Sequence, residues 1–200
     1  MKIKRCFISI ELPGEMIYVI KNIQNLIKKK NMFIGKFTEP ENLHLTLKFL
    51  GEIDEYKISN VMRMLKSVEF NEFEAELGNV GVFSKKFSKN PRFFVSKNFK
   101  KEEFSDIKII WIELLGKVFE LQKEIDNKLI NLFEPENMFM SHITLARVKR
   151  VYDKKELINY LEGIKPRKIK FKIDKFILKS SELNSEGPIY KDIKKYSLKS

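Results

Sequence analysis

Two short stretches of the sequence decide the fold: PENLHLTLKFLG at Pro40–Gly51 and SHITLARV at Ser141–Val148. Each stretch contains one His-x-Thr-x motif, and the motif residues are His44, Thr46, His142 and Thr144. The whole chain has two histidines and three threonines, so the motifs use every histidine and two of the threonines. This repetition indicates two related halves, each contributing one imidazole and one hydroxyl to a shared site.

The spacing of each motif predicts a β-strand. Residues i and i+2 of a strand point to the same face and lie about 6.6 Å apart, whereas on a helix they would diverge by about 200°. His44 and Thr46 should therefore share one face, with Leu45 and Leu47 buried on the other. The second motif repeats this pattern.

The paired motifs predict acid–base chemistry on a phosphate. Histidine titrates near neutral pH, so two imidazoles beside one substrate can act as base and acid in the same turnover. Threonine hydroxyls can donate hydrogen bonds to non-bridging phosphate oxygens. No Cys, Asp or Glu lies near the histidines at zinc-ligand spacing, so we expect no metal and no cofactor. The alternative is that both histidines are core residues of ordinary strands.

Composition is consistent with one cytoplasmic domain that binds an anion. The chain has 200 residues, of which 43% are hydrophobic, and this can bury one core or two small lobes that share a core. A formal net charge of +12 favours an anionic partner such as RNA. We expect no signal peptide at residues 1–13 and no membrane span, and the single cysteine, Cys6, should be a small core residue.

The periodicity of apolar residues predicts alternating strands and helices. The expected strands are Arg5–Glu11, Leu43–Leu50, Phe73–Phe83, Arg92–Val95, His142–Val148, Lys168–Lys179 and Tyr190–Leu198. The expected helices are Glu15–Lys30, Glu55–Val68, Glu102–Leu132 with a break near Gly116, and Asp153–Leu161 with Asp153 as N-cap. This order predicts an α+β fold of two lobes, each with a mostly antiparallel sheet backed by helices.

The chain resembles the 2H phosphoesterases, and within them the RNA 2′,3′-cyclic phosphodiesterases of the ThpR/LigT type, also called 2′-5′ RNA ligases. The resemblance covers nearly the whole length. It rests on both motif stretches, on an opening strand at Arg5–Pro13, and on Leu178–Leu183 and Gly187–Tyr190 as a C-terminal hairpin. Two positions depart from the family pattern. The family often has a tryptophan a few residues before the first motif stretch, where the nearest aromatic residue here is Phe37, and it often has a proline before the second histidine, where this chain has Ser141.

The resemblance implies a single bilobal domain over residues 1–200, with pseudo-two-fold symmetry and both motifs lining a central cleft. It implies metal-independent hydrolysis of RNA 2′,3′-cyclic phosphate ends to 2′-phosphates. His44 is then the proton donor and His142 the proton acceptor. It implies RNA or nucleotides with such ends as partners and no obligate protein partner. Two alternatives stay open: 2′-5′ ligation by the reverse reaction, and an RNA-end-binding module without turnover.

Three further residues are candidates for substrate binding. Lys48 shares the face of His44 if the strand is regular, so its ammonium could meet the phosphate. Arg147 should point away from His142 unless a bulge or the strand end turns it. Tyr190 could stack on a base. Each could instead serve the core, a turn or an ion pair between lobes.

Overall fold

The computed structural model describes residues 2–84, 106–184 and 187–200. The elements in chain order are β1 (Lys4–Glu11), α1 (Gly14–Lys30), β2 (Phe33–Phe37), the 3-10 turn η1 (Pro40–Asn42), β3 (His44–Ile53), α2 (Glu55–Leu65), β4 (Phe73–Ser84), β5 (Ile107–Leu115), α3 (Val118–Leu129), β6 (His142–Val151), α4 (Lys154–Gly163), β7 (Phe171–Ile173), β8 (Lys175–Leu183) and β9 (Pro188–Ser197). The strand expected over Arg92–Val95 lies outside the described residues.

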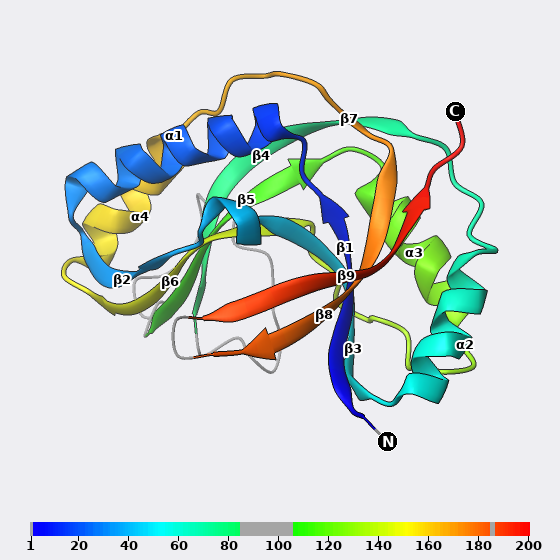
Figure 1. The fold of residues 1–200 in the computed structure, drawn as a ribbon. Coiled ribbons are helices and arrows are strands. Elements are labelled where there is room, and N and C mark those ends of the chain that lie inside the picture. The colour runs from blue at the N-terminus through cyan, green and yellow to red at the C-terminus, as the bar shows by residue number, and fades with distance from the viewer. Residues whose placement is uncertain (1, 85–105, 185–186) are drawn as a thin grey trace.

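The strands form one curled antiparallel sheet in the order β7-β4-β5-β6-β3-β1-β8-β9, with β2 added to β6 (Figure 1). The two motif strands, β3 and β6, meet at its centre through one residue pair, Leu45 and Ile143. The α+β prediction is confirmed, and the two expected sheets are the two halves of this sheet, joined at that pair.

The sheet order reads the same from the centre outwards in both directions. β3, β1 and β8 on one side correspond to β6, β5 and β4 on the other, and every one of these neighbours is antiparallel. A helix follows the middle strand of each trio, α1 after β1 and α3 after β5. The internal repetition predicted from the motifs therefore extends to these six strands.

The helices form two pairs at opposite ends of the molecule (Figure 1). In one pair, α4 lies beside α1, and the hydroxyl of Tyr160 donates to the carbonyl of Leu26 over 3.1 Å. In the other pair, α2 packs on α3, and α3 also contacts β3. None of the described helices is long and apolar enough to cross a membrane.

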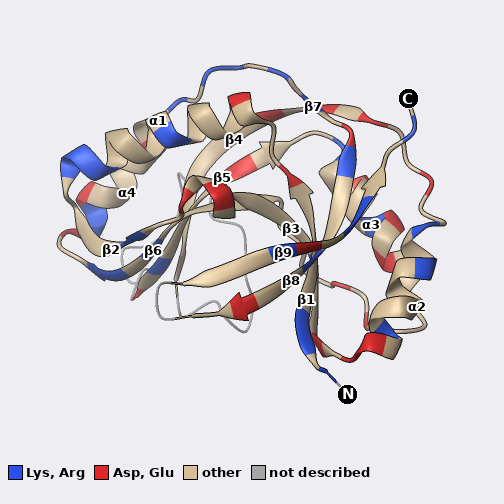
Figure 2. Cartoon of the chain, in the orientation of Figure 1, with Lys and Arg blue, Asp and Glu red and all other residues tan. Residues whose placement is uncertain are grey.

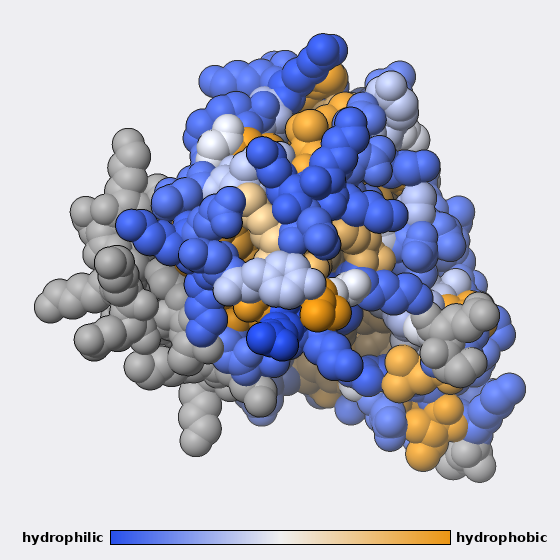
Figure 3. All heavy atoms as spheres, turned by 90° about the vertical axis from the view of Figure 1, so that its left-hand side faces the viewer, coloured by the Kyte–Doolittle hydropathy of each residue, from blue (hydrophilic) through white to orange (hydrophobic). Residues whose placement is uncertain are grey.

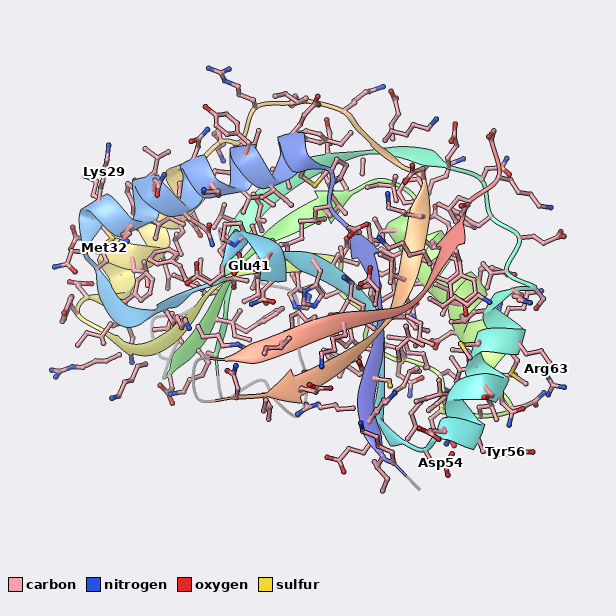
Figure 4. All side chains as sticks on the ribbon, viewed as in Figure 1. Lys29, Met32, Glu41, Asp54, Tyr56 and Arg63 are labelled. Carbon is pink, nitrogen blue, oxygen red and sulfur yellow. The ribbon has the colours of Figure 1, made fainter. Side chains whose placement is uncertain are left out.

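Two helices begin at aspartate caps, of which the sequence predicted one, Asp153. Asp153, the expected N-cap of α4, accepts a hydrogen bond from the backbone N–H of Glu156 over 2.9 Å. Asp54 caps α2 in the same way through Lys57 over 2.7 Å, at the lower right of Figure 4. These bonds satisfy backbone N–H groups that have no partner within the helix.

The helix expected over Glu102–Leu132 is wrong in its first half. The segment Ile107–Leu115 forms β5, and α3 begins only after Gly116, where φ is 132° and the predicted break falls. β5 lies between two other strands and buries side chains on both faces, so its apolar residues show no clean alternation. Such a run cannot be told from a buried helix by periodicity alone.

Two other differences concern strands. The strand expected over Lys168–Lys179 is divided at Asp174 into β7 and β8, which pair with different neighbours, β4 and β1. β2 was not predicted, because only one of its five residues, Phe33, is buried. β2 is stabilised by its backbone pairing with β6, which the sequence of β2 alone does not indicate.

The close packing of Trp111 generates a stability prediction. Trp111 is fully buried on β5, and a Cβ added to Gly81 on the paired strand β4 would overlap its indole ring. We expect Gly81→Ala to lower the free energy of unfolding by about 1–3 kcal/mol, the usual cost of overpacking. Gly163→Ala at the end of α4 is the matched control, because no atom lies within 4 Å of its added Cβ. Equal melting temperatures for the two variants would contradict this packing.

Candidate active site

A β-bulge follows the threonine of each motif. On β3, Thr46 pairs with Ser9 and Lys48 with Ile8, so one residue of β3, Leu47, is extra. On β6, Thr144 pairs with Trp111 and Ala146 with Ile110, so Leu145 is extra. An extra residue reverses the alternation of faces beyond it. The two motif strands therefore carry the same irregularity at the same position.

Before each bulge, the alternation is the predicted one. Leu45 and Ile143 are fully buried, whereas both histidines and both threonines are partly exposed on the opposite face. Since Leu45 pairs with Ile143 in antiparallel register, His44 lies across from Thr144, and His142 lies across from Thr46. The fold thus brings the four motif residues together around the centre of the sheet.

After the bulge, Lys48 lies on the core side, so the expectation that it shares the face of His44 is wrong. Its side chain is 3% exposed, forms an ion pair with Asp126 of α3 and donates to the carbonyl of Glu134 over 2.8 Å. The expectation assumed a regular strand, and the bulge at Leu47 removes that condition. Lys48 cannot meet a phosphate beside His44 from this position.

The same irregularity turns two exposed residues toward the histidines. Arg147, five residues after His142, is exposed on the motif face because of the bulge at Leu145, which meets the condition set from the sequence. Phe49, five residues after His44, takes the equivalent place on β3 and is 65% exposed. Sequence reasoning missed Phe49, although its equivalence to Arg147 could have been read from the two motifs.

Backbone carbonyls orient both imidazoles in the same way. Nδ1 of His44 lies 2.8 Å from the carbonyl oxygen of Asn42, and Nδ1 of His142 lies 2.9 Å from that of Met140. A carbonyl can only accept, so each Nδ1 carries a proton and donates it. Nε2 of a neutral imidazole is then a free base, and that of His44 accepts from the hydroxyl of Thr46 over 3.1 Å.

Aromatic rings flank the imidazoles. The rings of Phe7 and Tyr190 lie 5.1 and 5.0 Å from that of His44, and Tyr190 meets it edge to face. Phe83 meets His142 edge to face at 5.0 Å. The structure thus places Tyr190 beside His44 and adds two phenylalanines that the sequence did not single out. These contacts restrict the rotation of both imidazoles.

Burial disfavours the charged form of both imidazoles, and nearby cations add to this effect at His44. Burial lowers the pKa of His44 to about 4; the hydrogen bond to Asn42 opposes this, and the charges of Lys179, His142 and Arg147 lower the pKa further. Burial also lowers the pKa of His142, opposed by the hydrogen bond to Met140. The positive charges of Lys179 and Arg147 near His44 also favour a bound anion.

Within the described ranges, no group of three or more His, Cys, Asp and Glu side chains could hold a metal ion. The site instead offers two imidazoles, two hydroxyls and one guanidinium around the centre of a duplicated sheet. An α+β fold with this pair of motifs defines the class of two-histidine phosphoesterases.

A comparison with family models gives the same class. The model described as LigT-like phosphoesterase matches residues 10–93 and 113–190, and the chain belongs to this family. The RNA 2′,3′-cyclic phosphodiesterase of Methanocaldococcus jannaschii is 32% identical over 195 residues, which are 96% of this chain and 99% of the relative. That of Methanothermobacter thermautotrophicus is 31% identical over 202 residues, covering 97% and 98%.

Solved structures share the fold at lower sequence identity. Escherichia coli LigT in its apo form superposes with a TM-score of 0.74 at 18% identity, and the match covers 100% of both chains. The protein TT0787 of Thermus thermophilus gives a TM-score of 0.71 at 23% identity over 97% of each chain. Sequence divergence has therefore left the two-lobed arrangement intact.

The depressed histidine pKa values generate a second prediction. A phosphate anion between the imidazoles should stabilise their charged forms, so inorganic phosphate should raise the pKa of His44 from about 4 toward neutrality. Proton NMR can follow this directly, because the chain has only two histidines. Sodium chloride at equal ionic strength is the control. A titration curve that phosphate leaves unchanged would mean that no anion binds beside the imidazole.

Proposed function

We propose that this chain hydrolyses the terminal 2′,3′-cyclic phosphate of RNA to a 2′-phosphate, without a metal, through His44 and His142. The observation that carries the proposal is the shared geometry of the two imidazoles. Each donates its Nδ1 proton to a carbonyl two residues earlier in the chain, which leaves Nε2 for the substrate. Two relatives named RNA 2′,3′-cyclic phosphodiesterase, 31–32% identical over nearly the full length, support the same activity.

In the proposed reaction, the oxygen of a water molecule attacks phosphorus while Nε2 of His142 takes its proton. The bond from phosphorus to the 3′ oxygen breaks, and Nε2 of His44 donates a proton to that oxygen. The product keeps the phosphate on the 2′ oxygen. The Nδ1 bonds to Asn42 and Met140 persist in both protonation states, so each ring keeps its orientation through the cycle.

Substrate binding lets the acid take up the proton that it needs from the solvent. Both imidazoles are neutral in the free protein near pH 7, and a phosphodiester anion raises their pKa values when it binds. One imidazole can then be charged while the other stays neutral. This condition predicts a bell-shaped dependence of the turnover rate on pH.

The remaining residues of the site bind the substrate in this proposal. The hydroxyls of Thr46 and Thr144 donate to the non-bridging oxygens, and Arg147 adds a charge-assisted contact from the exposed side of β6. Tyr190 packs against His44, and the exposed ring of Phe49 offers a surface on which a base can stack. Lys48 has no part in phosphate binding.

The charge distribution supports RNA as the partner. Lysines and arginines without interspersed acids follow β2 and β6 at one end of the sheet (Figure 2), and the face at that end is mostly hydrophilic (Figure 3). Lys36 of β2 lies directly opposite Arg147 of β6, so two basic residues are adjacent on these strands. The formal net charge of +12 also favours binding of the negatively charged RNA backbone. We place this activity in the cytoplasm and without an obligate protein partner.

The proposal is tested with a panel of 2′,3′-cyclic nucleotides and cyclic-phosphate-ended RNAs in the presence of EDTA. We expect a 2′-phosphate product, and we expect His44→Ala and His142→Ala each to lower kcat by at least about 100-fold. The double variant should be little worse than either, because the pair acts as a unit.

Near-normal turnover in either single variant would restore the interpretation of the histidines as core residues. Activity that EDTA abolishes and a divalent ion restores would refute the metal-independent mechanism. Joining of RNA ends without hydrolysis would favour the ligase alternative, which uses the same residues in reverse.

The threonines carry a separate prediction. Thr46→Val and Thr144→Val keep the shape of the side chain but remove the donor, so each should lower kcat by about 10- to 1,000-fold. The melting temperature should hardly change, since both side chains are partly exposed. Thr38→Val, at the third threonine, is the matched control outside the motifs. Lower melting temperatures with unchanged kcat/KM would instead assign the motif threonines a structural role.

A further inference from the structure

Two buried polar side chains each connect the two halves of the sheet. Gln24 lies on α1, which follows β1, and Asp126 lies on α3, which follows β5. Both make hydrogen bonds to segments of the opposite half. Neither side chain is part of the catalytic proposal.

Gln24 ties the bulge of one motif strand to the segment that leads to the other histidine. Its Nε2 donates to the carbonyl of Leu145, the extra residue of β6, over 2.9 Å. The same atom donates to the carbonyl of Thr38 over 2.8 Å. Thr38 begins the segment through η1 that ends at Asn42, whose carbonyl orients His44.

Asp126 makes the corresponding connection in the other direction. One carboxylate oxygen pairs with Lys48, which directly follows the bulge of β3. The other accepts from the backbone N–H of Glu136 over 2.7 Å. Glu136 begins the segment that ends at Met140, whose carbonyl orients His142.

The two connections occupy equivalent places in the duplicated fold. Gln24 stands thirteen positions after Glu11, which pairs with His44, and Asp126 stands thirteen positions after Glu113, which pairs with His142. Thr38 and Glu136 each stand six positions before the histidine that follows. Different side chains therefore perform the same connection at positions related by the pseudo-two-fold axis.

We propose that Gln24 and Asp126 are positioning residues that set the spacing of His44 and His142 across the centre of the sheet. Along β3 and β6 one residue pair joins the two halves, and β2 and the backbone N–H of Thr38 add hydrogen bonds to β6. The two side-chain connections fix the distance between the motif strands where these backbone bonds do not reach. A misplacement of about 1 Å between catalytic groups can lower the rate about 100-fold, so loss of either connection should lower kcat. This expected loss of kcat rests on the proposed function.

Gln24→Met is the first test, because it removes both donors and keeps the length of the side chain. With 2′,3′-cyclic AMP as substrate, we expect kcat to fall by about 10- to 100-fold while KM changes by less than about threefold. Lys48→Met/Asp126→Leu, which leaves no buried unpaired charge, should behave in the same way. Lys48→Met/Asp126→Asn retains an acceptor for Glu136 but cuts the tie to β3, and should also lose kcat.

Gln122→Met is the matched control. Gln122 is as deeply buried as Gln24 on the equivalent helix, but among the described residues its side chain bonds only to Asp126 within α3, over 2.8 Å. We expect its kcat to stay within about threefold of the parent. Equal losses in Gln24→Met and Gln122→Met, or losses that follow the fraction of unfolded protein, would overturn the proposal.

Proton NMR of the two histidines tests the positioning independently of activity. Gln24→Met should shift the titration of His44, because the segment that carries the acceptor for Nδ1 then loses its bond to Gln24 and keeps the backbone bond from Thr38 to Leu145. Gln122→Met should leave both titrations unchanged. Unaltered histidine titrations in Gln24→Met would overturn the proposal even if the rate fell. A chain that hydrolyses no cyclic phosphate would refute the proposed function, and the NMR comparison would still decide this one.

Discussion

Pairing between β3 and β6 is limited to Leu45 and Ile143, and the bulges at Leu47 and Leu145 explain why. A bulge bends its strand and increases the local twist, so the two motif strands diverge soon after they meet. The sheet can then curl around the motif residues while Leu45 and Ile143 stay fully buried beneath them. Under the proposed function, the substrate binds where the two motif strands diverge.

The same bulges determine which cations serve the core and which face the site. Without them, Lys48 would stand beside His44, and Arg147 would point into the core. With them, Lys48 is buried against Asp126, and Arg147 is exposed. A buried ammonium is tolerable only with a partner, because the desolvation of an unpaired charge costs several kcal/mol. A single inserted residue per strand thus exchanges the roles of two cations.

The sequence alone was sufficient for the motif strands, their faces, the α+β class, the cap at Asp153 and the break at Gly116. Those features depend on local spacing and on residue types with strong positional preferences. The assignment failed where the decisive interaction is distant in sequence. Ile107–Leu115 becomes a strand because β4 and β6 flank it, and the bulge at Leu47 appears only in the register against β1. No pattern within either segment contains that information.

The exchange of helices between halves has a consequence for how such a chain can arise. α1 follows a strand of one half but reaches β6 of the other, and α3 follows a strand of that half but packs on β3. A half-chain with one motif would leave the face beneath its own strands uncovered. Two identical half-chains would cover each other by exchanging helices, as a two-fold symmetric dimer does. The present chain has the form of such a dimer fused into one polypeptide, with Gln24 and Asp126 at equivalent positions.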